Sequence, residues 1–265
     1  MCKFIYWGII MKTLTRDKLK IEIFDNRDLM GKKVAEDVAN KINELLCSKE
    51  YINMIFAAAP SQLDMISHLL KQNVEWGRIN AFHMDEYVGL EKDAPQGFGN
   101  FLAKYLFDKV PFRSVNYING QTESIEEECE RYGDLLKKYP TDIVCLGIGE
   151  NGHIAFNDPD EADFNDGAII KSVKLDDICR QQQVNDGCFN SINEVPKTAL
   201  TLTVPTLFAG TYLFCTVPAP TKANAVKEVY TTDKIDEHCP ATIMRKHSNA
   251  IMYCDKDSGK FLLEE

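Results

Sequence analysis

The sequence predicts an α/β fold with a mostly parallel central sheet and helices on both of its faces. Short apolar runs of strand length alternate with amphipathic segments of helix length. The chain has 265 residues, which is within the range of open α/β domains, and no repeat or linker interrupts the alternation. We therefore expect one domain over residues 1–265, with residues 1–12 as an extension.

The extension is short and apolar. Its first ten residues, MCKFIYWGII, carry only Lys3 as a basic group and run into KTLTRDKLK without a small-residue cleavage site. This pattern favours an upstream extension over a signal peptide, with Met11 as an alternative start. No stretch of the chain reaches the roughly 20 apolar residues that a membrane-spanning helix requires.

The first half of the chain alternates strands and helices. The expected elements are a strand IEIF (21–24), a helix over 28–48, a strand INMIFAA (52–58), a helix over 62–72 and a strand INAFHM (79–84). This rhythm is typical of βαβ units, whose strands run parallel and whose helices cover the sheet.

The second half continues the alternation. The expected helices are 97–108, 123–138 and segments near 222–230 and 240–247, and the expected strands are DIVCLGI (142–148), ALTLTV (199–204), YLFCTV (212–217) and AIMYCD (250–255). The predicted sheet therefore draws strands from the whole length of the chain.

Composition limits the classes of partner. Lys and Arg number 30 and Asp and Glu number 40, so the formal net charge is −10, which argues against binding to nucleic acid or to an anionic membrane. The nine cysteines form no CxxC pair, and several lie in apolar runs, as reduced buried thiols do. We expect a soluble, cytoplasmic protein with a small-molecule ligand; homo-oligomerisation stays open.

Polar segments follow four of the predicted strands. They are AAAPSQ (57–62), MDEY (84–87), GENGH (149–153) and PAPTK (218–222). Parallel sheets bind ligands outside the carboxyl ends of their strands, so these four segments can converge on one pocket.

Two of these segments favour an anion. Lys222 stands at the predicted start of a helix, where its charge adds to free backbone amides, although a solvated lysine fits equally well. Ser61 and Gln62 open another helix after Pro60, where they either bind phosphate oxygens or simply cap the helix. We take all three as candidate phosphate ligands.

An acidic pair follows the third strand. Asp85 and Glu86 are adjacent, so in an extended segment their side chains diverge. We expect one carboxylate to face the pocket as a base and the other to serve structure or to pair with a cation, and we include Glu86 among the candidate substrate-binding residues. The alternative is an ordinary acidic turn.

A polar loop follows the fourth strand. Gly149 and Gly152 let its backbone turn sharply, and both are candidate substrate-binding positions. His153 is flanked by Asn151 and Asp158, which can fix its tautomer or raise its basicity as a proton shuttle requires. A lone histidine here is more often structural, and these neighbours are what favour catalysis.

Metal and dinucleotide sites are not predicted. His153, Asp85 and Asp158 offer nitrogen and oxygen ligands, but the chain has no HxH, HExxH or Cys/His spacing. The run GIGENG has the glycine spacing of a dinucleotide fingerprint, but the histidine that follows it would crowd a pyrophosphate, and a lone match of this kind is weak evidence. We expect neither a metal nor a redox cofactor.

Two longer motifs carry a family resemblance. FHMDEYVGL (82–90) and LGIGENGHIAFNDP (146–159) resemble the most specific motifs of the glucosamine-6-phosphate deaminase/isomerase family, and VPKTALTLTVPTL (195–207) fits its later pattern. This family shares a modified Rossmann-like, three-layer fold with the 6-phosphogluconolactonases. The resemblance implies that Asp85 is the base at the sugar's C1 and C2, that His153 opens the ring and that Lys222 binds the phosphate.

The chain departs from the family pattern at several positions. Asn151 replaces an aspartate, Asp158 replaces a glutamate, and AAAPSQ replaces a glycine-rich phosphate loop. The family's phosphate-binding arginine aligns with Gln183, so we expect Arg180, three residues earlier, to take its role. Since Asn151 cannot stabilise an imidazolium by charge, an aspartate restored there is expected to leave the reaction intact or improve it.

The resemblance implies an aminosugar-phosphate deaminase/isomerase. It would convert a 2-amino-2-deoxyhexose 6-phosphate, with glucosamine 6-phosphate as first choice, to a ketohexose 6-phosphate and ammonia. A galactosamine-6-phosphate deaminase, a 6-phosphogluconolactonase-like hydrolase and a non-catalytic sugar-phosphate sensor stay open as alternatives.

Overall fold

The computed structural model describes residues 10–175, 177–185 and 187–264. Most of the predicted extension, residues 1–9, lies outside the described residues. Residues 10–12 belong to the first strand, Ile10–Arg16, which the sequence patterns did not predict.

The main sheet has eight strands in the order β1-β2-β11-β10-β7-β3-β4-β6. These are β1 (Ile10–Arg16), β2 (Leu19–Phe24), β11 (Ala250–Asp255), β10 (Tyr212–Val217), β7 (Ile143–Leu146), β3 (Ile52–Phe56), β4 (Ile79–His83) and β6 (Ser114–Asn116). All pairings are parallel except that of β1 with β2, which is antiparallel. The predicted mostly parallel sheet is confirmed.

Helices cover both faces of this sheet and make the fold three-layered. One face carries α1 (Arg27–Leu46), α2 (Leu63–Leu69) and α3 (Phe98–Leu102), and the other carries α4 (Ile125–Lys138), α6 (Val204–Phe208), α7 (Ala223–Thr231) and α8 (Lys260–Leu263). Side chains of a strand alternate between the two cores: Met54 and Phe56 of β3 pack in the first and Ile55 in the second. The continuous apolar runs of the sequence arise because both faces of the strands are buried.

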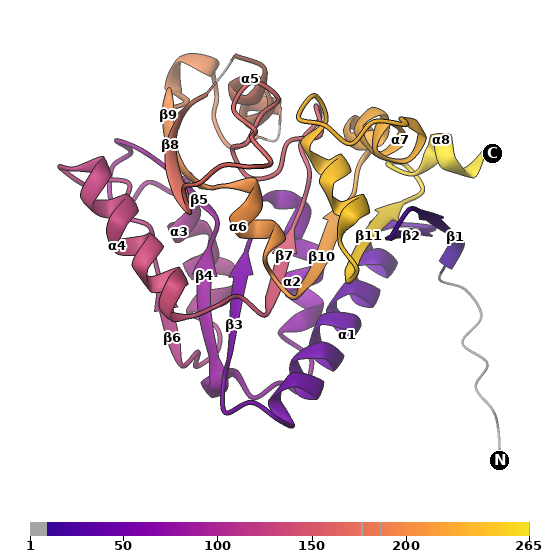
Figure 1. Ribbon diagram of the computed structural model, residues 1–265, viewed down its shortest axis with the longest axis horizontal. Coiled ribbons are helices and arrows are strands. Elements are labelled where there is room, and N and C mark those ends of the chain that lie inside the picture. Colours follow the sequence, from indigo (N-terminus) through magenta and orange to yellow (C-terminus); the bar gives the residue numbers. More distant parts are fainter. Residues whose placement is uncertain (1–9, 176, 186, 265) are drawn as a thin grey trace.

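A second, antiparallel sheet lies over one end of the main sheet. It contains β5 (Asp85–Tyr87), β9 (Thr198–Leu202) and β8 (Ile170–Lys174). Figure 1 shows it at the top of the molecule beside α5 (Asp177–Asn185). The predicted strand ALTLTV is therefore real, but it belongs to this sheet, since an apolar run does not specify its partner.

Other differences concern weak local patterns. The helix expected over 240–247 is a 3-10 segment, Pro240–Lys246, and the sequence patterns missed the short strands β5, β6 and β8 and helix α5. Short or polar elements take their structure from tertiary contacts more than from periodicity. In the described ranges, no helix combines the length and the apolar character needed to cross a membrane.

Candidate active site

Four neighbouring strands deliver the predicted site residues to one cavity. Strands β10, β7, β3 and β4 are adjacent in the sheet, and the loops at their carboxyl ends carry the four polar segments of the sequence. The cavity has a volume of about 420 Å³. The predicted residues that line it are Ser61, Gln62, Asp85, His153 and Lys222.

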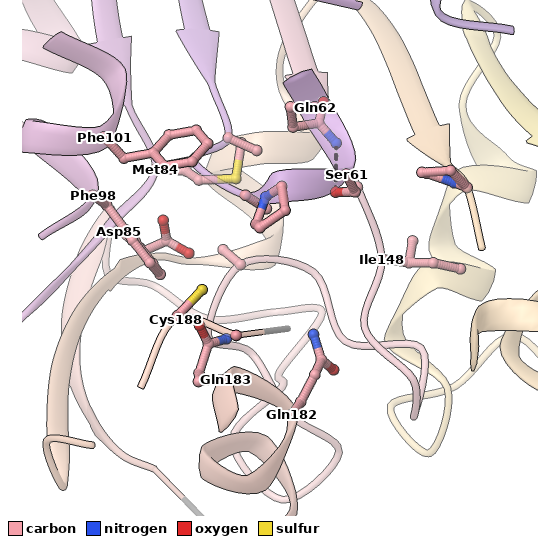
Figure 2. A pocket seen from close by; sticks show the side chains of 18 of the residues that line it. Ser61, Gln62, Met84, Asp85, Phe98, Phe101, Ile148, Gln182, Gln183 and Cys188 are labelled. Atoms are coloured by element: carbon pink, nitrogen blue, oxygen red, sulfur yellow. Dashed lines mark hydrogen bonds between the residues drawn. The ribbon is translucent and has the colours of Figure 1, made fainter. Parts of the chain in front are cut away.

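Asp85 and Glu86 diverge as neighbours in a strand do. Asp85 lines the cavity, with its carboxylate shown in Figure 2, whereas Glu86 points away from it. The Glu86 carboxylate accepts hydrogen bonds from the backbone N–H groups of Tyr87 and Phe98, both at 2.9 Å, and of Gly99 at 2.8 Å. Glu86 therefore fixes the start of α3 and is not placed to bind a ligand in the cavity, contrary to its inclusion among the substrate-binding residues.

Burial changes the acidity of the Asp85 carboxyl. Burial raises its pKa well above the ordinary value of 3.8, and the negative charge of Glu86 raises it further. Glu86 also has a raised pKa because it is buried, although its three backbone N–H donors counteract part of the effect. A buried carboxylate with a raised pKa can take and return a proton on carbon near neutral pH.

The loop that carries His153 depends on two glycines. A Cβ on Gly149 would lie 2.2 Å from the His153 ring, so only glycine lets the imidazole pack there. Gly152 has a φ of +79°, and a Cβ on it would lie 2.5 Å from Cys239 Sγ. Neither glycine lines the cavity, so neither is placed for the predicted contact with substrate. Both glycines instead allow the loop to adopt its shape.

His153 is held by the two polar side chains that the sequence singled out. Its Nδ1 lies 2.9 Å from Asp158 Oδ1, and its backbone N–H donates to Asn151 Oδ1 at 3.1 Å. Asn151 Nδ2 donates to Asp158 Oδ1 at 2.9 Å. Burial by itself raises the pKa of Asp158, but the contacts with His153 and Asn151 outweigh this effect and hold the pKa below its usual value. Asp158 is therefore a carboxylate that can stabilise an imidazolium.

Three further lining residues are suited to an anion. Ser61 and Gln62 form a 3-10 turn at the start of α2, and Gln62 Nε2 donates to Ser61 Oγ at 3.2 Å and to Thr216 O at 3.3 Å. The Gln62 amide thus links Ser61 to the backbone of β10. Lys222 ends the 3-10 turn before α7 and is buried, with 6% of its surface exposed.

Comparison with known proteins identifies the family of the chain. The sequence profile of the family described as glucosamine-6-phosphate isomerases/6-phosphogluconolactonase matches residues 25–253. The chain belongs to this family. The resemblance found in the sequence motifs is therefore confirmed.

Relatives within the glucosamine-6-phosphate isomerase/6-phosphogluconolactonase family match most of the chain. A glucosamine-6-phosphate deaminase of Bacillus cereus is 32% identical over 225 residues, 85% of this chain and 84% of that protein. One from Lactobacillus delbrueckii subsp. bulgaricus is 28% identical over 246 residues, 92% of this chain and all of that protein.

Solved structures of the family share the fold. A monomeric glucosamine-6-phosphate deaminase superposes with a TM-score of 0.82 at 26% identity, covering 91% of this chain and 98% of that one. A 6-phosphogluconolactonase from Thermotoga maritima gives a TM-score of 0.74 at 21% identity, covering 90% of this chain and all of that one, and indicates the fold alone.

Arg180 does not replace the family's phosphate-binding arginine. Its guanidinium donates to the backbone oxygens of Ile192 and Val195 and pairs with Asp177, and it does not line the cavity. Gln182 and Gln183 face the cavity from the same helix (Figure 2). Our expectation for Arg180 is wrong because its guanidinium is held by the 192–195 turn.

Two basic residues that the sequence motifs did not reveal also line the cavity. Arg27 lines it from the start of α1 and is anchored by Asp64 and by the backbone oxygen of Pro60. Lys104 lines it from the segment after α3. The rule that ligands bind at the carboxyl ends of strands could have found Arg27, which follows β2 by three residues. None of the motifs quoted from the sequence contains Arg27.

We now expect Asn151→Asp to slow the reaction, which reverses the expectation from sequence. Asn151 donates a hydrogen bond to Asp158, and an aspartate would instead place two carboxylates about 3 Å apart, so one must take up a proton or turn away. Turnover at neutral pH should fall by roughly tenfold, and by more than in Asn151→Ala, which adds no charge. Steady-state rates of both variants test this expectation, and a faster Asn151→Asp enzyme would contradict it.

Proposed function

We propose that this protein is an aminosugar-phosphate deaminase/isomerase. It converts a 2-amino-2-deoxyhexose 6-phosphate, with glucosamine 6-phosphate as first choice, to a ketohexose 6-phosphate and ammonia. The observation that carries the proposal is one cavity with the buried carboxylate of Asp85, the imidazole of His153 and the cation of Lys222 on its walls. Membership of the family and the similarity to glucosamine-6-phosphate deaminases support it.

Each group has a step in this reaction. His153, oriented by Asp158, transfers the proton that opens the sugar ring. Asp85 then takes the proton from C2 and returns it to C1, which leaves an imine at C2. Water adds to the imine, and ammonia leaves as the ketone forms. Lys222 and Ser61 hold the phosphate, and Arg27 supplies further positive charge at the edge of the cavity.

A lactonase is the second candidate because the family includes such enzymes. Lactone hydrolysis needs water activated beside an ester carbonyl and no proton transfer on carbon. One base, such as His153 paired with Asp158, is enough to activate that water, so the lactonase reaction has no second step that requires the carboxylate of Asp85. The deaminase therefore uses more of the site.

We also propose the cellular setting. None of the eight cysteines in the described ranges belongs to a disulfide, which favours a reducing compartment such as the cytoplasm. There, as a single-domain enzyme, the protein would act in amino sugar breakdown, without a metal or redox cofactor.

Product analysis tests the function. Purified protein is incubated separately with glucosamine 6-phosphate, galactosamine 6-phosphate and 6-phosphogluconolactone. We expect ammonia and a ketose phosphate in equal amounts from glucosamine 6-phosphate. Lactone hydrolysis without ammonia from either amino sugar would establish the hydrolase instead, and tight binding without any product would establish the sensor.

Lys222→Ala is expected to raise KM far more than it lowers kcat. The phosphate is remote from C1 and C2, so the lysine contributes mainly to uniform binding of substrate and transition state. Loss of a buried charged hydrogen bond of about 1.5–3 kcal/mol corresponds to a roughly 10–100-fold higher KM. Lys227→Ala, on the exposed face of α7, is the matched control. A large loss of kcat with unchanged KM would contradict this role.

A further inference from the structure

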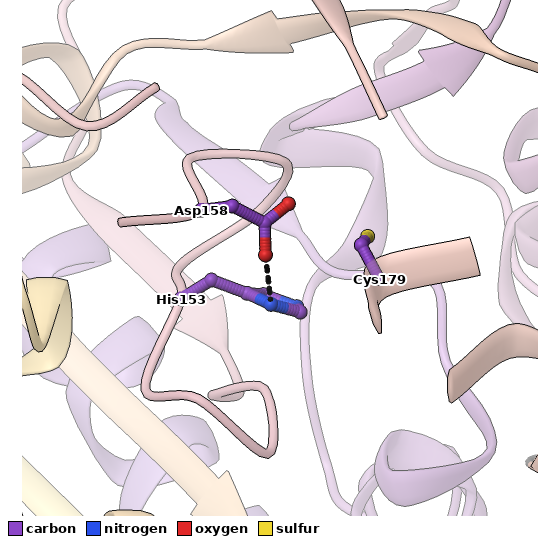
Figure 3. A group of neighbouring side chains, drawn as sticks. All are labelled: His153, Asp158 and Cys179. Carbon is purple, nitrogen blue, oxygen red and sulfur yellow. Dashed lines mark ion pairs between the residues drawn. The ribbon is translucent and has the colours of Figure 1, made fainter. Parts of the chain in front are cut away.

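A cysteine completes a cluster of metal-binding side chains beside the proposed catalytic histidine. An imidazole nitrogen of His153, a carboxylate oxygen of Asp158 and Sγ of Cys179 all lie within 4.8 Å of one another. Figure 3 shows the first two on the loop after β7 and Cys179 on α5. The three residues are buried, with exposed fractions of 8%, 3% and 1%. Among the described residues, this is the one group of its kind.

The nitrogen, oxygen and sulfur donors of this cluster suit a soft or borderline divalent cation. Zinc takes nitrogen from histidine, oxygen from aspartate and sulfur from cysteine, whereas Mg²⁺ and Ca²⁺ prefer oxygen alone. Zinc–ligand bonds of about 2.0–2.3 Å place tetrahedral ligands about 3.3–3.8 Å apart, so separations of up to 4.8 Å in the cluster must shorten by at most about 1–1.5 Å. His153 Nδ1 and Asp158 Oδ1, which are 2.9 Å apart, must separate slightly if both bind the ion. Rotation of the three side chains about their own bonds can supply such a movement.

The cluster adjoins the cavity through His153. Asp158 and Cys179 do not line the cavity, so a water molecule or a substrate hydroxyl would reach a bound ion from the side of the His153 ring. Three protein ligands with one open position are typical of accessible zinc sites. The thiol of Cys179 would lose its proton to the solvent when its bond to the ion forms.

We propose that His153, Asp158 and Cys179 form an inhibitory site for a thiophilic divalent cation such as Zn²⁺. A bound ion occupies the nitrogen or the carboxylate that ring opening needs, so enzyme with bound metal cannot process the cyclic sugar. The family motifs that identify His153 do not include Cys179, so the metal site depends on a residue outside those motifs. Binding of the ion is independent of the proposed function; only the inhibition rests on it.

Cobalt spectroscopy tests the binding without any enzyme assay. Reduced protein is titrated with Co²⁺, whose bond to a thiolate gives a charge-transfer band in the near ultraviolet. We expect one Co²⁺ per chain with this band, displaced by Zn²⁺. Cys179→Ala should lose the band and weaken Zn²⁺ binding by at least about tenfold. Cys179→Ser provides the same test with the side-chain volume retained.

Two other cysteines provide matched controls. Cys188 lines the cavity and Cys47 is exposed, and alanine at either position should leave the band and the Zn²⁺ affinity unchanged. Zn²⁺ should stop ammonia release in the wild type and in both controls, but not in the Cys179 variants at the same concentration. A band that survives in Cys179→Ala and Cys179→Ser, a band that depends on Cys188, or no binding at all would overturn the proposal.

Discussion

Asp85→Asn is expected to abolish ammonia release and to leave the protein folded and able to bind the sugar phosphate. The amide has nearly the shape of the carboxylate but cannot accept a proton from C2. Loss of a general base costs about 10²–10⁴-fold in rate, and here the same group must also deliver the proton to C1. Steady-state ammonia production, together with binding measured by calorimetry, checks this expectation.

Thermal stability gives Asp85→Asn a second readout. Because burial raises the pKa of Asp85, the folded state binds this proton more tightly than the unfolded state does, and stability is lost as the pH rises through the raised pKa. The neutral amide of the variant avoids the cost of burying a charged carboxylate, so the variant should unfold at the same or a higher temperature at neutral pH. Asp134→Asn, at an exposed position on α4, is the control and should change neither property. A lower melting temperature would mean that Asp85 stabilises the fold instead.

His153→Gln is expected to separate ring opening from the chemistry on carbon. Glutamine retains a polar group in the loop but cannot transfer a proton between the ring oxygen and the anomeric hydroxyl. Turnover of cyclic glucosamine 6-phosphate should fall by about 10²-fold or more. A ketose phosphate that cannot close its ring, such as 5-deoxyfructose 6-phosphate, should still exchange its C1 protons with solvent in the presence of ammonia.

The two substrates must be compared within one preparation of each enzyme. His238→Gln is the control because the His238 side chain is 93% exposed and lies outside the cavity. It should process both substrates at the wild-type rate. Equal losses on the cyclic and the open substrate in His153→Gln would place His153 in the carbon chemistry as well and contradict a role limited to ring opening.

Periodicity in the sequence was sufficient to predict the six inner strands of the main sheet and the position of the cavity, but not the edge strands β1 and β6. Buried parallel strands form continuous apolar runs, and the rule that ligands bind at their carboxyl ends predicted that Asp85, His153 and Lys222 converge. The small sheet was not predictable because its pairing of β5 with β9 joins residues 85–87 to residues 199–201. Local patterns contain no information about such distant partners.

The errors at the site have a similar origin. Arg180 and Gln183 are three residues apart on α5, and only the contacts of the 192–195 turn decide that the guanidinium is held away from the cavity. Strand alternation correctly predicted that the side chains of Glu86 and Asp85 diverge. The hydrogen bonds of Glu86 with Phe98 and Gly99 were not predictable, because they depend on where α3 begins. Arg27 was missed because the family motifs do not include it.

The central claim is that Asp85 carries the proton between C2 and C1. The most direct measurement is turnover of glucosamine 6-phosphate in D₂O, with deuterium at C1 of the ketose product followed by NMR. In the wild-type enzyme, C1 should receive protium from C2 together with solvent deuterium, because the carboxyl of Asp85 can exchange its proton with solvent before it returns it, and Asp85→Asn should incorporate no deuterium. Incorporation by Asp85→Asn at the wild-type rate would contradict the assignment of Asp85 as the base.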